Sequence, residues 1–534
     1  MTADLILTHA RIYTLDGARP WAEAVACRDG RILAVGSDAG IRALVGPETR
    51  VIDCGGRLVL PGLTDAHVHF LQYAMRRKQV SLFGLTDPAD VRERVAAAVA
   101  AAAPGEWVTG WGWDSHRWNV QPTAALIDDF SPDNPVVLAR MDMHTWWVNS
   151  WAMETAGVTA GTPDPTEASI GRYPDGRPTG LFSEWNAIDL IERHMPRPDA
   201  AVLATRLEEA IAEAHRLGLT GIHDQRVERE GAESLRLFQA LRRAGKLALR
   251  VHANVAADFL PEAVQLGLES GFGDDTLWLG HVKAFADGTM SSATAHMLEP
   301  FEGQPDNRGI VVTPTDELWR LIVDAGAAGF PISVHAIGDR AVREVLDVMS
   351  EWETTRGQAS RLPMPQRIEH VQVIHPDDLG RLAPAGIVAS VQPVHLRTDW
   401  RTADRVWGGR ARYAYAFRSL LDRGTALAFG SDAPVAPLNP MPGIHAAVTR
   451  EDEVGEPAGG WYPAERLTLA EAIEGYTLGP ARLSGKADRF GSITPGKYAD
   501  LVVLSQNLFE IEPAAIPATT AWLTVFNGRV VHEA

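Results

Sequence analysis

The chain has 534 residues, of which 46% are hydrophobic and 22% are charged, as is ordinary for a globular protein with a sizeable core. Its formal net charge of -18 argues against nucleic acid as a partner, because a phosphate backbone requires surfaces rich in Lys and Arg. No apolar run approaches the roughly 20 residues of a membrane helix, no signal peptide is evident, and two cysteines cannot form a disulfide framework. We therefore expect a cytoplasmic chain with neither a nucleic-acid nor a membrane partner.

Both ends of the chain consist of short alternating segments that are typical of β-strands. In the first 60 residues the pair Asp29-Gly30 is a hairpin turn signal, and Asn527-Gly528 near the C-terminus has a similar form. We predict one small β-sandwich domain made of residues 1–60 and 487–534, because chain ends often lie close together in compact domains. Two unrelated clusters of strands are the alternative.

Between these ends, predicted strands alternate with predicted helices, which is typical of βαβ units. Eight apolar runs each end in a polar residue: 59–69, 219–224, 247–255, 278–287, 331–335, 366–370, 386–392 and 426–432. Helical patterns follow most of them, for example at 200–217, 317–328, 339–351 and 412–423. Eight such units predict an α/β fold that closes into a TIM-like (β/α)8 barrel over residues 61–486. An open, doubly wound sheet is the alternative, but no Gly-rich phosphate loop follows the first strand.

The connection after the first strand is unusually long. Roughly 150 residues separate the first run from the second, far more than a normal βα connection. We predict that residues 100–185 form an insertion over the barrel mouth, with strands of its own at 107–110 and 136–140. Seven of the 16 tryptophans lie between residues 107 and 151. They predict either an aromatic wall for a bulky apolar ligand, with Trp113 in contact with it, or the insertion's own core.

Polar side chains stand at the ends of the predicted strands, where a parallel barrel gathers them at one mouth. On the first strand, His67 and His69 are separated by one residue, so both imidazoles face the same side. The later strands bring Lys283, His335, His370 and Asp432 to the same end. For a lone His-x-His, the wet face of a strand is an equal alternative. Six such residues in step with the strands indicate instead a metal site.

Several stretches of the chain carry a resemblance to one family. They are Pro61-Gly62-Leu63-Thr64-Asp65-Ala66-His67-Val68-His69, Lys283-Ala284-Phe285-Ala286-Asp287-Gly288, His335-Ala336-Ile337-Gly338-Asp339, Ile368-Glu369-His370 and Gly430-Ser431-Asp432-Ala433-Pro434. On these motifs the chain resembles the amidohydrolase superfamily and, within it, the YtcJ-like branch that includes N-substituted formamide deformylases. The resemblance implies a metal-dependent hydrolase that cleaves an amide or N-formyl C–N bond in a small, hydrophobic or aromatic N-substituted substrate. It leaves a homodimer open.

The resemblance also implies a centre of one or two divalent ions, with zinc as the expected metal, held by His67, His69, Lys283, His335, His370 and Asp432. In the two-ion form, Lys283 would be carboxylated on its amine and bridge the ions, because a free ammonium offers no acceptor. A barrel lysine paired with Asp287 or Asp432 is the alternative. Metal-bound hydroxide would attack the carbonyl, with Asp432 as the catalytic proton shuttle. Asp432 as a mere ligand or a helix N-cap is the alternative.

Weaker candidates for contact with the substrate are His144, Gln392 and His395. His144 lies with Asp142 in a stretch that resembles a motif of this branch, and Glu184 matches a family position of unclear role. Hydrolysis of a cyclic amide, a lactone or another ester, and metal-dependent lyase or decarboxylase chemistry, are alternatives on the same site. A non-catalytic barrel is a further alternative, but it would be expected to lose ligands, and this chain keeps all six.

Overall fold

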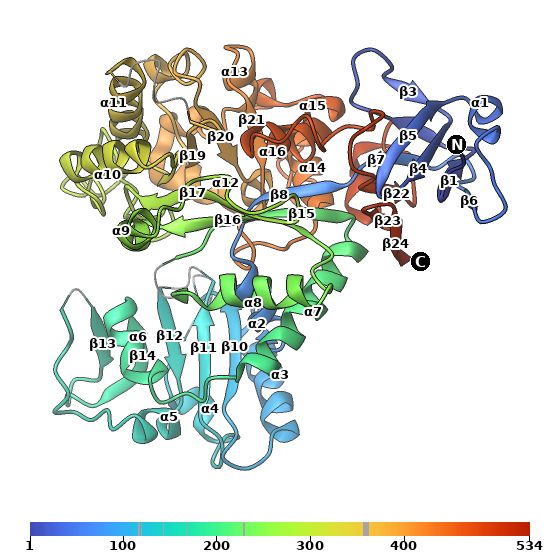
Figure 1. Cartoon of the computed structure of the whole chain (residues 1–534). Coiled ribbons are helices and arrows are strands. Elements are labelled where there is room, and N and C mark those ends of the chain that lie inside the picture. Colours follow the sequence, from blue (N-terminus) through green and yellow to red (C-terminus); the bar gives the residue numbers. More distant parts are fainter. Residues whose placement is uncertain (116–117, 119, 142–143, 167, 228–229, 356–361) are drawn as a thin grey trace. The chain divides into compact units, whose positions relative to one another are not determined.

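The computed structural model describes residues 1–115, 118, 120–141, 144–166, 168–227, 230–355 and 362–534 (Figure 1). The chain divides into two compact units, the first made of Met1–Phe70 with Glu208–Ala534 and the second of Leu71–Leu207. The second unit includes the predicted insertion at 100–185, whose place over the barrel mouth stays a prediction. Within the described ranges, every helix falls short of the length and hydrophobicity that a bilayer-spanning segment needs.

The first unit is built around an eight-stranded parallel sheet. In sheet order its strands are β8 (Leu63–Val68), β15 (Leu219–Asp224), β16 (Arg250–Ala256), β17 (Leu277–Phe285), β18 (Ile332–Ala336), β19 (Arg367–His370), β20 (Val388–Val391) and β21 (Leu427–Phe429). The order in the sheet is the order in the chain, as in a (β/α)8 barrel. The predicted barrel fold is therefore confirmed.

The first and last strands of this sheet meet at their carboxyl ends. An isolated parallel bridge joins Val68 to Ala433. The Asp432 N–H donates to the His67 carbonyl at 2.7 Å, and the His69 N–H donates to the Ala433 carbonyl at 2.8 Å. Gly430 allows this approach, because a Cβ there would lie 2.5 Å from the His67 backbone nitrogen. These bonds close the barrel at the end where the predicted site residues stand.

Helices follow most of the strands, and their sequences explain which face is buried. Helix α11 (Asp339–Thr355) follows β18 and buries Val342, Val345 and Met349, which lie three and four residues apart on one face. Other helices of the barrel are α7 (Ala200–Arg216), α8 (Glu233–Arg243), α9 (Leu260–Gln265), α10 (Thr315–Ala327), α12 (Pro393–Trp407) and α14 (Pro440–Thr449). The predicted helix at 412–423 is interrupted. A 3-10 turn at Gly408–Tyr413 and a short helix α13 (Phe417–Leu421) replace it, because Tyr415 between them has a φ of 52°.

The first unit also holds two smaller sheets, one made only of N-terminal strands and one that combines strands from both ends of the chain, and both termini lie in this part of the unit (Figure 1). One sheet has the order β5 (Arg31–Gly36), β4 (Ala24–Arg28), β1 (Leu5–Thr8) and β6 (Arg50–Asp53). The other has the order β24 (Arg529–Glu533), β23 (Ala521–Phe526), β22 (Leu501–Leu504), β7 (Leu58–Pro61), β2 (Arg11–Tyr13) and β3 (Trp21–Ala22). At both predicted hairpin turns the two central residues have positive φ: 50° and 76° at Asp29-Gly30, and 50° and 73° at Asn527-Gly528.

The predicted first barrel strand at 59–69 is in fact two strands in two sheets. β7 pairs with β2 and β22, whereas β8 pairs with β15. Gly62 separates them, and a Cβ at this position would lie 2.1 Å from the Thr220 hydroxyl. The two runs are continuous in hydrophobicity because both are buried, so the pattern alone could not show the break.

The second unit contains a six-stranded sheet of its own. Its order is β13 (Ser169–Arg172), β14 (Pro178–Ser183), β12 (Thr145–Val148), β11 (Val136–Arg140), β10 (Val108–Trp113) and β9 (Val80–Ser81). Helices α3 (Pro88–Ala101), α5 (Ser150–Thr155) and α6 (Trp185–Glu192) belong to the same unit. Trp113, Trp118 and Trp147 pack against one another with ring centroids 5.9–6.1 Å apart.

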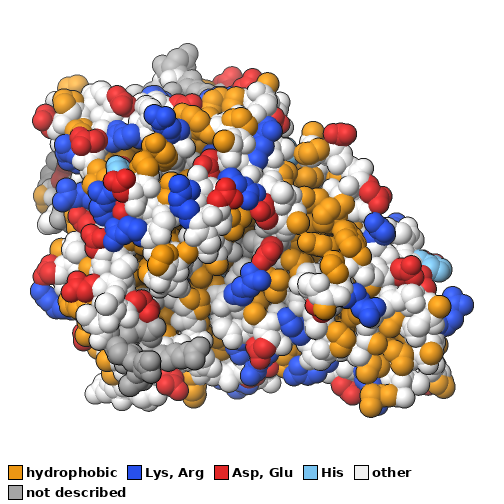
Figure 2. Space-filling model, turned by 90° about the horizontal axis from the view of Figure 1, so that it is seen from above, with side chains coloured by type: hydrophobic (Ala, Val, Ile, Leu, Met, Phe, Trp, Pro, Cys, Tyr) orange, Lys and Arg blue, Asp and Glu red, His pale blue; other side chains and the backbone are white. Residues whose placement is uncertain are grey.

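Acidic and basic side chains are interspersed on the face of the molecule drawn in Figure 2, and hydrophobic side chains reach the surface in several places. The negative net charge therefore does not form one continuous acidic area on this face.

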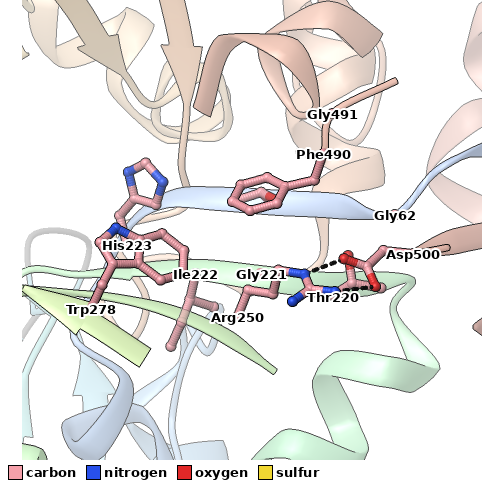
Figure 3. A pocket seen from close by; sticks show the side chains of 11 residues that line it. Gly62, Thr220, Gly221, Ile222, His223, Arg250, Trp278, Phe490, Gly491 and Asp500 are labelled. Carbon is pink, nitrogen blue, oxygen red and sulfur yellow. Dashed lines mark hydrogen bonds and ion pairs between the residues drawn. The ribbon is translucent and has the colours of Figure 1, made fainter. Parts of the chain in front are cut away.

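A buried ion pair joins the amino end of the barrel to the segment that returns to the small sheets. Arg250 at the start of β16 donates from Nε and Nη2 to the Asp500 carboxylate, and both side chains are 5% exposed. The Arg250 guanidinium also lies 4.0 Å from the ring centroid of Tyr498. The pair lines a small cavity with Phe490 and His223 (Figure 3). Gly62, Thr220 and Arg250, which also line this cavity, lie at or next to the starts of their strands, away from the strand ends that carry His67 and Asp432.

Replacing Arg250 with methionine should lower the free energy of unfolding by about 3–5 kcal/mol, because the Asp500 carboxylate is left buried without its counter-charge. Urea unfolding followed by tryptophan fluorescence measures the loss. Arg242→Met is the matched control, since its pair with Asp274 is nearly half exposed and should contribute about 1 kcal/mol or less. Equal losses in the two variants would contradict this prediction.

Candidate metal centre

Side chains from three strand ends come together at the carboxyl end of the barrel. His67, His370 and Asp432 each offer a ligand atom, and these atoms lie within 4.8 Å of one another. His67 Nε2 is 3.4 Å from Asp432 Oδ1, and His69 Nε2 is 3.3 Å from the same oxygen. His67, His370 and Asp432 are buried, and His69 is partly buried. The structure thus gathers the two histidines of the first strand with residues from the sixth and eighth.

Hydrogen bonds from the Nδ1 atoms fix the tautomers of two of these imidazoles. His67 donates from Nδ1 to Glu369 Oε2 at 2.6 Å, and His370 donates from Nδ1 to Gln392 Oε1 at 2.8 Å. Because both partners are acceptors, the proton sits on Nδ1 and each Nε2 presents a lone pair. Burial lowers the pKa of His67 to about 4 and holds that of His370 well below its ordinary value, so both rings are neutral.

The consequence is a space between the side chains that is lined by electron-rich atoms. The lone pair of the His67 Nε2 faces the Asp432 carboxylate, whose pKa is held below its usual range. Burial by itself would raise that pKa, but interactions with the neighbouring histidines, among them a hydrogen bond from His69, outweigh it. A nitrogen lone pair and an anionic oxygen in contact repel each other unless a cation lies between them. Imidazole nitrogens and a carboxylate oxygen are the ligands that zinc takes in proteins, so the residues present fit a metal ion.

His335 and Lys283 extend the cluster along the neighbouring strands. The ring centroid of His335 is 4.5 Å from that of His370, and His335 donates from Nε2 to the Gly288 carbonyl at 3.0 Å. Burial and the charge of Lys283 lower the pKa of His335 to about 3, which leaves its Nδ1 as a free lone pair.

The Lys283 amine is buried without a hydrogen-bond partner among the described residues. Burial lowers its pKa to about 8. The described residues contain no ion pair between Lys283 and Asp287, so the alternative in which these two side chains pair is not supported. Asp287 accepts instead from the backbone N–H groups of His296, Ile337 and Gly338.

The backbone is strained where two of these side chains leave their strands. The φ angles of His370 and Val371 are 72° and 42°, and that of Asp432 is 59°. Residues other than glycine rarely adopt this region, and a β-branched valine is a genuine outlier there. Such strain persists where the surroundings over-determine it, most often at functional sites. At the ends of β19 and β21, these backbone turns change the direction in which the side chains of His370 and Asp432 point.

Asp65, two residues before His67 on β8, holds the barrel closed beside the cluster. Its carboxylate accepts from the backbone N–H of His67 at 3.0 Å and from that of Ser431 at 3.0 and 3.1 Å. Burial raises the pKa of this carboxyl to about 7. It therefore bridges the first and last strands.

The predicted substrate contacts of the first unit lie in different surroundings. Gln392 is 2% exposed and sits behind His370, where it orients that ring. His395 on α12 is partly exposed, donates from Nε2 to the Ser431 carbonyl at 3.2 Å and stands 6.4 Å from the His370 ring. His395 can thus still face a ligand, whereas Gln392 is positioned to support a ligating histidine.

The predicted contacts of the second unit are His144 and Trp113. His144 hydrogen-bonds from Nδ1 to Glu184 Oε2 at 2.9 Å, and both side chains are partly exposed. Trp113 is 1% exposed and donates its indole N–H to the Leu138 carbonyl at 2.8 Å, which favours the core interpretation for this residue. Asp142 lies outside the described residues. The roles of His144 and Trp113 toward a substrate stay predictions.

Arg367 and Glu369, to which the sequence pattern gave no predicted role, stand behind His67. Both side chains are fully buried inside the barrel, where they pair with each other. They could have been found as residues two apart on a strand that ends in a candidate ligand, since such residues face the same side of the sheet. A buried Arg and Glu are rare enough to mark that face.

Comparisons with known proteins agree with this arrangement. Residues 50–532 match the profile of the amidohydrolase family. The chain is 34% identical to the Arabidopsis thaliana protein LONG AFTER FAR-RED 3, over 96% of this chain and 88% of that one. It is 32% identical to the Bacillus subtilis protein YtcJ, whose name assigns it to the amidohydrolases, over 98% of both chains. It is 29% identical to the N-substituted formamide deformylase of Arthrobacter pascens, over 99% of this chain and 98% of that one.

A solved structure of a metal-dependent hydrolase from Pyrococcus horikoshii, whose activity is uncharacterised, is also similar. It superposes with a TM-score of 0.77 at 25% identity, over 95% of this chain and 99% of that chain. With the family profile, the relatives and the histidine–carboxylate cluster in agreement, the chain belongs to the amidohydrolase family and is a metal-dependent hydrolase of carbon–nitrogen bonds other than peptide bonds.

Proposed function

We propose that this enzyme hydrolyses the C–N bond of an amide or N-formyl group in a small N-substituted substrate. The observation that carries the proposal is the His67 Nε2 lone pair, fixed by Glu369 and aimed at the Asp432 carboxylate 3.4 Å away. The similarity to the Arthrobacter pascens N-substituted formamide deformylase, which spans nearly the whole of both chains, supports the N-formyl substrate class.

The ligands divide between two ion positions, with zinc as the proposed metal. His67 and His69 would hold one ion with Asp432, and His335 and His370 the second, with Lys283 as a carboxylated bridge. The closeness of His370 to His67 and Asp432 also suits a single ion held by these three residues. Metal bound there supplies Lewis-acid polarisation of the scissile carbonyl and activation of water as a nucleophile at neutral pH.

Asp432 moves the proton in this scheme. Its carboxylate is ionised at neutral pH and stands 3.3–3.4 Å from the Nε2 atoms of His67 and His69. Oδ1 or Oδ2 accepts a proton from the attacking water and returns it to the leaving nitrogen as the C–N bond breaks. The protonated nitrogen leaves as a neutral amine, and the other product is a carboxylic acid, which releases its remaining proton to solvent and becomes a carboxylate. His395 is available at the rim to hydrogen-bond the substrate.

Lys283 suits carboxylation because its amine is buried and has no hydrogen-bond partner among the described residues. Its lowered pKa, about 8, leaves a larger share of neutral amine near pH 7 than an exposed lysine has. The neutral amine adds to CO2 and releases one proton, giving a carbamate with anionic oxygens in place of a cation. That change of charge is what a pair of dications at this position requires.

A panel of N-formyl and N-acyl amines with aromatic and aliphatic substituents tests the substrate class. The purified enzyme should release amine and carboxylate in equal amounts. Dipicolinate should abolish turnover and Zn2+ should restore it, with one or two equivalents of metal per chain by elemental analysis. Release of CO2 would indicate decarboxylation, and turnover confined to lactones or esters would replace the C–N assignment.

Asp432→Asn should lower kcat by about 10²- to 10⁴-fold while most of the metal is retained, because the amide cannot accept the proton. Steady-state kinetics and metal analysis of the same sample separate the two effects. The control is Asp378→Asn, which removes a buried carboxylate paired with Arg343 and Arg381 and should leave kcat near the wild-type value. Full activity of the Asp432 variant would exclude the proton shuttle.

Lys283→Met should reduce the zinc content from two equivalents per chain to one if the lysine bridges two ions. Elemental analysis of protein prepared in bicarbonate measures the difference. Lys486→Met is the matched control, because Lys486 is also largely buried but pairs with Asp275 at the other end of the barrel. The two-ion form is contradicted if the wild type never exceeds one equivalent, or if the Lys283 variant still holds two.

A further inference from the structure

A charged pair, Arg367 and Glu369, lies inside the barrel next to the metal cluster. The two residues stand two apart on β19, so their side chains face the same way, and both are fully buried. Barrel interiors are normally filled by branched apolar side chains. A buried ion pair is also weak evidence for stability, because the desolvation of two charges offsets their attraction. The pair therefore calls for an explanation other than stability.

Among the described residues, every partner of the Glu369 carboxylate is a hydrogen-bond donor. Arg367 donates to both carboxylate oxygens, and the Ser333 hydroxyl donates to Oε1 at 2.7 Å. His67 donates from Nδ1 to Oε2 at 2.6 Å. The carboxylate is thus fixed in place by donors from two neighbouring side chains, and its remaining partner is a candidate metal ligand.

The Arg367 guanidinium anchors that carboxylate to several strands at once. It donates from Nη2 to the Ala66 carbonyl of β8 at 2.6 Å and to the Ser390 hydroxyl of β20 at 2.7 Å. It also donates from Nη1 to His223 Nδ1 on β15 at 3.1 Å. The guanidinium is planar and rigid, and its donors are held by three other strands, so the Glu369 oxygens have little freedom to move.

We propose that Glu369, held by Arg367 and Ser333, is a positioning residue that fixes the tautomer and ring orientation of His67 for metal binding. A carboxylate can only accept, so it keeps the His67 proton on Nδ1 and leaves Nε2 open toward Asp432. This inference rests on the metal site of the proposed function. It adds that metal binding depends on a fully buried residue that does not ligate the ion.

The substitution Glu369→Gln tests it with little change in shape. Because Arg367 donates to both carboxylate oxygens, the new NH2 group opposes an Arg367 donor at either position. If it replaces Oε2 it also opposes His67 Nδ1–H, so the imidazole has to flip or move its proton to Nε2, and either change removes a metal ligand. If it replaces Oε1, the contact with Arg367 Nε is lost, the carboxamide is displaced and it no longer fixes the ring.

The measurements are the Zn2+ dissociation constant by chelator competition and the absorption spectrum of the Co2+-substituted protein, neither of which needs a substrate. Glu369→Gln should weaken Zn2+ binding by roughly 10- to 100-fold and alter the Co2+ spectrum. The matched control is Asp500→Asn, which also neutralises a buried carboxylate paired with an arginine, but far from the cluster. It should bind Zn2+ within about twofold of wild type, with an unchanged spectrum.

A milder pair of variants covers the case in which Glu369→Gln does not fold. Ser333→Ala removes one donor to Glu369, and Ser270→Ala removes a buried hydroxyl that donates to the Gly280 carbonyl instead. Ser333→Ala should weaken Zn2+ binding measurably, and Ser270→Ala should not. Wild-type affinity and spectrum in Glu369→Gln, or equal affinities in the two serine variants, would overturn the positioning role. Absence of metal binding by the wild type would instead overturn the proposed function.

Discussion

The closure of the barrel between β8 and β21 is the constraint on which the site depends. His67 and Asp432 lie at opposite ends of the barrel segment in the chain, and backbone hydrogen bonds across this seam make them neighbours. Asp65 strengthens the seam by accepting N–H groups from both strands, and Gly430 leaves the space that the approach requires. Binding of an ion by His67 and Asp432 would in turn hold the seam shut. The geometry of the candidate centre and the completion of the fold are therefore two aspects of one contact.

Strain and buried charge are concentrated around the same seam. His370 and Asp432 occupy left-handed backbone conformations, and Arg367 and Glu369 are charged groups in the interior. Each of these features opposes folding when considered alone. They are tolerated because each strained or charged residue is tied to several strands, as Arg367 is to Ala66, His223 and Ser390. A bound cation would further offset the negative charge of the Asp432 carboxylate, which faces neutral histidines.

The sequence could predict the barrel and its ligand candidates because both follow from periodicity. Parallel strands end at one mouth, so His67, His335, His370 and Asp432 could be placed together without knowing any contact. The break at Gly62 could not be predicted, since two buried strands in different sheets give one continuous apolar run. Gln392 supports His370 in the structure, which a strand-end position does not show once the backbone turns, and its contact with a substrate stays a prediction. The burial of Trp113 depends on packing with Trp118 and Trp147, which spacing alone does not determine.

Strand β19 shows how one short sequence supplies both a ligand and its support. Alternation would send Arg367 and Glu369 to one face and His370 to the other. The positive φ of His370 breaks this alternation at the strand's end, so that the imidazole turns toward His67 while Glu369 reaches His67 from below. A regular strand could not have placed both side chains against the same ring. The backbone strain at His370 is thus the physical means by which two adjacent residues of one strand, Glu369 and His370, both reach the ring of His67, a candidate metal ligand.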